Sequence, residues 1–167
     1  MDAGAEEEFT RFVADRTVAL LRVAHALTGD QHAAEDLVQN ALAKAMLRWR
    51  HIEENPEAYV RRILYNDHIS GWRRRRSRPE TPMAAVPEPA GTDGTDAFHL
   101  RLQLRAALLE LPPRQRAVIV LRYLDDRSER EVAEILGCRE GTVASQASRA
   151  LAKLRRLVPA PVTEAWR

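Results

Sequence analysis

Apolar residues recur at the three- and four-residue spacing of an α-helix along almost the whole of this 167-residue chain. That period gathers apolar side chains on one face of a helix, whereas a half-buried strand needs strict alternation, which no segment sustains. The stripes run over residues 9–27, 34–49 and 60–64, and helical spacing returns between about residues 99 and 158. The chain is therefore predicted to be all-α.

Local signals predict where these helices begin and end. Thr28-Gly29-Asp30 ends the first stripe, because glycine accepts the left-handed conformation that often closes a helix. Asn55 and Pro56 open the third helix, since proline suits the first helical turn. In the C-terminal half the pattern pauses at residues 111–113, which read Leu-Pro-Pro.

Residues 77–98 break the helical pattern. They contain four prolines and two glycines, and no lysine or arginine occurs between residues 80 and 98. This composition predicts a flexible acidic linker between two helical domains. The predicted organisation is a domain at 1–76, the linker at 77–98, a second domain at 99–158 and a tail at 159–167.

Charge is segregated along the chain, although the formal net charge is only +2. Segment by segment, the balance of basic over acidic residues is −5 for residues 1–57, +6 for 58–79, −4 for 80–98, +3 for 99–127 and +2 for 128–167. Such segregation predicts a polyanionic partner at the basic segments and a different partner at the acidic front. For the mildly basic rear, ordinary solvated helix faces remain the alternative.

Several function classes are disfavoured by what the chain lacks. A single cysteine allows neither a disulfide framework nor a multi-cysteine zinc site, and it fits a reducing cytoplasm. The chain contains no run of eighteen apolar residues, so membrane insertion is not predicted, and the acidic start does not resemble a signal peptide. We find no phosphate-binding glycine loop and no metal-spaced histidine cluster, so we predict no catalytic residue, no metal and no cofactor. Cys138 is expected to be half-buried, with a redox sensor as the alternative.

Residues 129–148 have the features of a helix-turn-helix. Ala133 stands where the two helices cross, Gly137 stands at the turn, and the second helix is expected to begin near Arg139. The face opposite the apolar stripe carries hydrogen-bonding and cationic side chains, which suit base edges and phosphates. The predicted DNA-contacting residues are Arg139, Thr142, Ser145, Gln146, Arg149 and Lys153.

Three stretches together resemble the extracytoplasmic-function (ECF) sigma factors of bacterial RNA polymerase, most closely the compact actinobacterial members. They are residues 34–39 (AEDLVQ), residues 59–67 (YVRRILYND), and residues 111–123 (LPPRQRAVIVLRY) continuing through 131–138 (EVAEILGC) to 141–143 (GTV). The resemblance covers roughly residues 8–76 and 99–158. It implies a sigma region 2 bundle and a sigma region 4 helix-turn-helix.

The resemblance also implies partners. The expected function is that of an alternative sigma factor, not an enzyme, which binds core RNA polymerase through the β′ clamp helices and the β flap. It directs the enzyme to promoters, melts the −10 element and reads the −35 element; an anti-sigma factor is a further expected partner. The polymerase-facing residues are expected to be Glu35, Asp36, Gln39 and Lys44, for which a solvated helix face is the alternative.

The −10 element is expected to meet the third helix, where arginines interleave with aromatic rings. Arginines neutralise phosphates, and rings stack on unpaired bases. By resemblance, the loop of residues 51–55 holds a flipped base. The expected contacts are His51, Asn55, Arg61, Arg62, Tyr65, Asn66, Trp72, Arg73 and Arg74. Core packing is the alternative for Tyr65 and Trp72, and Asp67 is expected to be a buried partner of an arginine.

One departure from the family concerns the predicted recognition helix. Many members carry a lysine after Gly-Thr-Val and an arginine two residues later, where this chain has Ala144 and Gln146. Fewer cations mean weaker phosphate attraction, so we expect this domain to need the polymerase to hold it on DNA. The alternative function is a stand-alone helix-turn-helix regulator that binds an operator without core polymerase.

Overall fold

A computed structural model describes residues 2–53, 55–77 and 96–158 of the chain. Within these ranges the protein consists of helices, and no strand occurs. The elements in chain order are α1 Ala3–Thr28, α2 Gln31–Arg48, η1 Trp49–His51, α3 Pro56–Ser77, α4 Asp96–Leu109, α5 Pro113–Ile119, η2 Val120–Leu124, α6 Glu129–Leu136 and α7 Glu140–Leu157. The all-α prediction is confirmed.

Helices α1 to α3 form the N-terminal unit, and their ends lie where the local signals predict. Gly29 follows α1 with φ 72°, and its N–H donates to the His25 carbonyl at 2.8 Å. The Asp30 carboxylate caps α2 by accepting from the Ala33 N–H at 2.8 Å. Asn55 precedes α3, and its Oδ1 accepts from the Ala58 N–H at 3.1 Å. Each of these groups satisfies backbone atoms that a helix end leaves unpaired.

Both ends of the predicted linker are helical. Helix α3 continues through Ser77, and α4 begins at Asp96, three residues before the expected start of the second domain. Acidic Asp96 suits a first helical turn because the helix dipole is positive there. The linker prediction for residues 78–95 and the tail prediction for residues 159–167 lie outside the described residues.

Helices α4 to α7 form the C-terminal unit, which contains the predicted helix-turn-helix. Ser128 and Glu131 begin α6 with a reciprocal capping box, and Gly137 ends it with φ 65°. Helix α7 starts at Glu140, one residue after the expected position. The spacing predicts an apolar face of Val143, Ala147, Ala150, Leu151 and Leu154 on α7; Leu151 is half-buried and the other four are buried.

A short π-helical turn, η2, connects α5 to the loop before α6. Here the Asp125 N–H donates to the Val120 carbonyl at 3.0 Å, and Asp126 adopts φ 51°. A left-handed residue other than glycine is uncommon, and aspartate is among the residue types that tolerate it best. This reversal places the side chains of Asp125 and Arg127 against the N-terminal unit.

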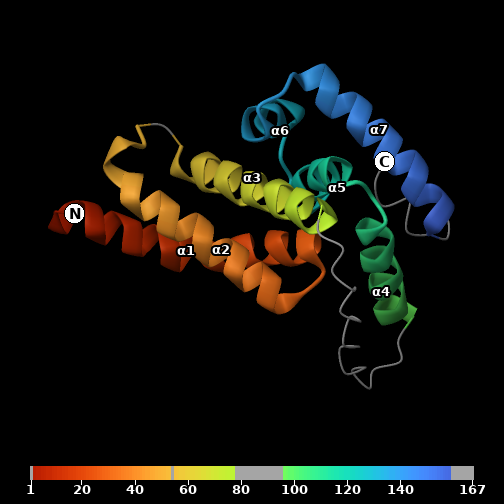
Figure 1. The fold of residues 1–167 in the computed structure, drawn as a ribbon, viewed down its shortest axis with the longest axis horizontal. Helices are drawn as coiled ribbons and strands as arrows, with labels where there is room; N and C mark the ends of the chain where they lie inside the picture. The colour runs from red at the N-terminus through yellow and green to blue at the C-terminus, as the bar shows by residue number, and fades with distance from the viewer. Residues whose placement is uncertain (1, 54, 78–95, 159–167) are drawn as a thin grey trace.

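The two units pack directly against each other. Helix α3 lies between the α1–α2 pair on one side and α5 and α6 on the other (Figure 1). One cluster of buried apolar residues includes Leu20 and Leu64 from the N-terminal unit together with Val118 and Val132 from the C-terminal unit.

In the described ranges, no helix is long and apolar enough to span a membrane.

Candidate polymerase and nucleic-acid interfaces

Helix α2 exposes the residues that the sequence predicts to face the polymerase. Asp36, Gln39 and Lys44 are exposed and Glu35 is half-buried, whereas Leu37 and Ala41 face the core. The Lys44 ammonium lies 2.7 Å from both carboxylate oxygens of Asp67. The prediction for Asp67 is therefore wrong in its partner, which is a lysine of α2, and in its burial, since its side chain is 26% exposed. Lys44 ties the exposed face of α2 to α3.

A basic cluster extends from the C-terminal end of α3. Arg73, Arg74, Arg75 and Arg76 are all exposed. The guanidinium of Arg76 lies 5.1 Å from the ring centre of Trp72, which is half-buried. Cations at this end of a helix are favoured by the helix dipole, which offsets part of their mutual repulsion. The cluster combines free charge with an aromatic face, as contacts to single-stranded DNA require.

Arg74 and Arg75 also line a cavity of about 460 Å³ between α2 and the C-terminal half of α3. Asp36 and Lys44 form part of its α2 wall. The cavity therefore adjoins both the predicted polymerase surface and the arginine cluster.

The loop predicted to hold a flipped base adjoins a hollow of about 380 Å³. His51 and Asn55 are both exposed, but Oδ1 of Asn55 is used as the cap of α3. The walls of the hollow come largely from residues that the sequence analysis did not single out: Met46, Leu47, Trp49 and Arg50. Leu47 is 80% exposed, so an apolar residue on the polar face of α2 is the signal that could have found this hollow.

Aromatic packing fixes Trp49, one of the residues that line this hollow. Trp49 is 8% exposed and lies 5.0 Å from Phe9 and 5.1 Å from Phe12, measured between ring centres. Edge-on and tilted contacts at these distances are favourable for aromatic pairs. Trp49, which precedes the loop, is thus anchored to α1, while His51, Glu53 and Asn55 are exposed.

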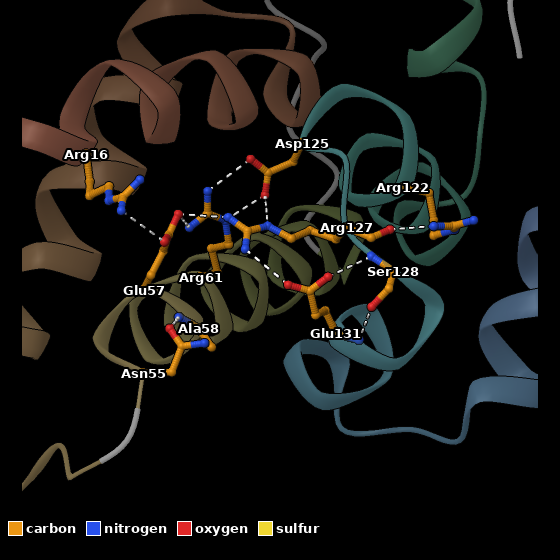
Figure 2. Close-up of polar contacts among 10 residues, drawn as sticks. All are labelled: Arg16, Asn55, Glu57, Ala58, Arg61, Arg122, Asp125, Arg127, Ser128 and Glu131. Atoms are coloured by element: carbon orange, nitrogen blue, oxygen red, sulfur yellow. Dashed lines mark hydrogen bonds and ion pairs between the residues drawn. The ribbon is translucent and has the colours of Figure 1, made fainter.

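Arg61 and Tyr65, both predicted to contact DNA, are buried between the two units. The Arg61 side chain is 1% exposed and makes a two-pronged contact with Asp125: Nε to Oδ2 at 2.7 Å and Nη2 to Oδ1 at 2.9 Å. Arg127 also reaches Asp125, at 3.0 Å, and Glu57, at 2.8 Å (Figure 2). Buried arginine and carboxylate groups need such mutual pairing, because their desolvation is costly.

Other predicted α3 contacts differ in their exposure. Asn66 is exposed, and Arg62 is exposed while its Nη2 donates to the Glu134 carbonyl of α6 at 2.9 Å. Tyr65 is fully buried, and burial together with the nearby Asp125 carboxylate raises the pKa of its phenol. The structure therefore brings part of the predicted −10 surface into the contact between the units.

The outward face of α7 is available to a partner along most of its length. Arg139, Thr142, Ser145 and Arg149 are exposed, and Gln146 is half-buried. The Lys153 ammonium donates to the Glu110 carbonyl at 2.6 Å, so it also fastens α7 to the end of α4. Ala144 is exposed on the same helix, and its methyl group adds no charge to the face.

Comparisons with known proteins account for both units. Sigma-70 region 2 matches residues 13–78, and sigma-70 region 4 matches residues 101–154. The RNA polymerase sigma-E factor of Streptomyces coelicolor is 41% identical over 89% of this chain and 84% of its own length. The ECF RNA polymerase sigma factor SigL of Mycobacterium tuberculosis is 34% identical over 92% of this chain and 90% of its own. The chain belongs to the ECF sigma factors.

The fold of this ECF sigma factor is similar to that of a solved relative. The sigma factor RpoE of Bartonella quintana, in complex with the anti-sigma factor NepR, has a TM-score of 0.71, 29% identity, and covers 90% of this chain and 96% of its own. ECF sigma factors are alternative sigma factors that direct RNA polymerase to promoters, and the family is not one of enzymes. A stand-alone regulator is not favoured, because both sigma regions are present.

Proposed function

We propose that three surfaces divide polymerase binding and promoter recognition among them. The α2 surface (Glu35, Asp36, Gln39 and Lys44) docks on the β′ clamp helices of core polymerase. Helix α3 and the 51–55 loop hold the −10 element, and α7 holds the −35 element while its unit rests on the β flap. The observation that carries the proposal is the placement of polar side chains: Asp36 and Gln39 are exposed on α2, and an arginine cluster is exposed at the end of α3.

Single-stranded DNA suits the surface near Trp72. The arginines beyond this ring supply charge for phosphates, and the ring offers a stacking face for an unpaired base. The hollow beside His51 lies near the start of α3, whereas Trp72 and the arginines lie near its end, so the two sites would contact different parts of the −10 element. Capturing a base in the hollow offsets the cost of unstacking it, which supports melting of the −10 element.

Helix α7 supplies few charges for its task. Arg149 and the half-buried Gln146 have the hydrogen-bonding groups that read guanine and adenine in the major groove. With Ala144 in place of a cation, and Lys153 engaged with Glu110, phosphate attraction is weak. We therefore assign −35 reading to the assembled holoenzyme rather than to the free chain.

The setting of this function is the cytoplasm, where core polymerase operates. An anti-sigma partner that covers both units is part of the proposal, supported by the complex of RpoE with NepR. The domain limits we propose are 1–76 for region 2 and 99–158 for region 4. They lie close to the family matches at 13–78 and 101–154.

Reversing one charge on α2 tests the docking surface. We expect Asp36→Arg to reduce co-purification with core RNA polymerase at least tenfold, because an exposed carboxylate that faces the polymerase becomes a repelling cation. Run-off transcription from a promoter library should fall with it. The measurement is the amount of sigma factor retained on immobilised core enzyme.

Asp15→Arg provides the matched control, since Asp15 is an exposed carboxylate on α1 and the change is the same. It should bind core polymerase as the wild type does, and both variants should keep the wild-type helical circular dichroism. Retention of Asp36→Arg at the wild-type level would refute the assignment of this surface.

A further inference from the structure

The contact between the two units is built on arginines that reach across it. Arg61 of α3 donates two hydrogen bonds to Asp125, and Arg62 donates to the Glu134 carbonyl. In the opposite direction, Arg116 Nη1 of α5 donates to the Leu27 carbonyl at 2.6 Å, and Arg105 Nη2 of α4 donates to the Gly29 carbonyl at 2.8 Å. The interface thus combines the shared apolar cluster with directional, charge-assisted bonds.

The carboxylate of Asp125 binds Arg61 of α3 with the geometry that a phosphate would use. Its two oxygens meet two guanidinium nitrogens at 2.7 and 2.9 Å, the fork geometry with which arginine binds carboxylates and phosphates alike. Because the Arg61 side chain is 1% exposed, a DNA phosphate cannot reach it while Asp125 is in place.

Two buried polar atoms on the same helix are left without partners. Among the described residues, neither the Tyr65 hydroxyl nor Nε2 of His68 has a hydrogen-bond partner. Buried polar groups are nearly always paired, and an unpaired one costs stability. Tyr65 stands one turn after Arg61, so the helix face covered by the C-terminal unit carries polar groups that this packing does not satisfy.

The predicted polymerase surface is open in the same state. Asp36 and Gln39 are exposed, as are Arg73 and Arg74 at the end of α3. Only the part of the −10 surface that includes Arg61 and Tyr65 is closed. Core polymerase can therefore meet α2 while the central part of α3 stays covered.

We propose that Asp125 is an intramolecular phosphate mimic that holds the free sigma factor in an autoinhibited state. The C-terminal unit must leave α3 before Arg61 and Tyr65 can take up the single strand of the −10 element. The inference rests on the proposed function, since it takes α3 to be the −10 surface. It adds that this chain restrains its own α3.

Asp125→Asn tests the mimic, because it removes the carboxylate with which the C-terminal unit pairs Arg61, and leaves Arg61 and its contact with Glu57 of the same helix intact. In the free protein we expect the radius of gyration, measured by small-angle X-ray scattering, to increase. Affinity for a fluorescent single-stranded oligonucleotide of mixed sequence, measured by anisotropy, should rise about tenfold as the open fraction grows. Adding Arg61→Ala to Asp125→Asn should abolish this gain in affinity, because the gain depends on the guanidinium of Arg61.

Asp126→Asn is the matched control. Asp126 is the next residue, it is exposed, and asparagine tolerates its φ of 51°. This variant should match the wild type in size and in oligonucleotide affinity. Arg105→Met is a second route to opening, because it removes the contacts of Arg105 with His25 and Gly29 at the end of α1 and changes no residue of α3.

Circular dichroism selects the variants that fold. If Asp125→Asn folds, wild-type size and wild-type oligonucleotide affinity overturn the proposal. If it does not fold, the same two measurements on Arg105→Met decide.

Retention on immobilised core polymerase separates this inference from the proposed function: a wild type that fails to bind core refutes the function. A wild type that binds core while the folded variant stays closed refutes only the autoinhibition.

Discussion

His68 is a histidine held neutral by its surroundings. It is 4% exposed, and burial, followed by the charges of Arg116 and Arg75, lowers its pKa to about 4. In the unfolded chain the pKa of histidine is about 6.5. Between these values the unfolded state binds more protons than the folded state, so the free energy of unfolding falls as the pH is lowered from 6.5 towards 4.

At the scale of this residue, we predict a loss of about 2 kcal/mol between pH 7.5 and pH 5 that depends on His68. Urea unfolding followed by circular dichroism at both pH values measures it. His68→Gln removes the titrating ring, so its free energy of unfolding should change less over the same interval by about that amount. An equal change in both proteins would contradict a neutral, buried His68.

Residues also show where sequence reasoning stops. Tyr65 had two interpretations from the helical wheel, and the structure places it in the core between the units, with 0% exposure. Asp67 was expected to pair with an arginine and instead binds Lys44, 23 positions away. A wheel shows which side of a helix a residue occupies, but the element that packs against that side depends on tertiary structure.

Elements were more predictable than residues, because their ends are encoded locally. Gly29, Pro56 and Gly137 stand at the helix boundaries that their conformational preferences indicate. The start of α4 at Asp96 was not found, since a proline- and glycine-rich composition hides a helix that begins at its edge. Element ends without a strong stop or cap signal are the ones that sequence patterns miss.

The turn between α6 and α7 supports a prediction at the scale of elements. Gly137 has φ 65° and no atom within 4 Å of the position of an added Cβ, so Gly137→Ala adds backbone strain without a clash. We expect it to lower the free energy of unfolding by about 1 kcal/mol. Urea denaturation of the two proteins measures the change.

Gly141→Ala is the comparison within the same motif. Gly141 lies in the first turn of α7, again with open space at the Cβ position. Alanine is the better helix former by up to about 1 kcal/mol, so this change should be neutral or stabilising. Similar destabilisation by both substitutions would mean that side-chain bulk, and not the left-handed backbone, limits position 137.

For the whole molecule, the sequence indicated two helical regions but not their packing against each other. The Arg61–Asp125 pair joins positions 64 apart in the chain, and the Arg116–Leu27 contact joins positions 89 apart. The charge of each segment led to the prediction that the arginines of α3 contact DNA. Segment charges cannot show that one of these arginines pairs with an acidic residue elsewhere in the chain. Long-range pairs of this kind follow from shape and burial, which no local pattern records.

The shared core predicts that the closed molecule unfolds as one cooperative unit. Trp49 and Trp72 both lie in the N-terminal unit, so tryptophan fluorescence follows that unit, whereas far-ultraviolet circular dichroism follows all helices. In a Trp166→Phe background, which removes the tryptophan outside the described residues, the two urea transitions should coincide. Two separated transitions would show that the apolar cluster common to both units does not couple them. In Asp125→Asn the two transitions should occur at different urea concentrations, because the N-terminal and C-terminal units then unfold independently.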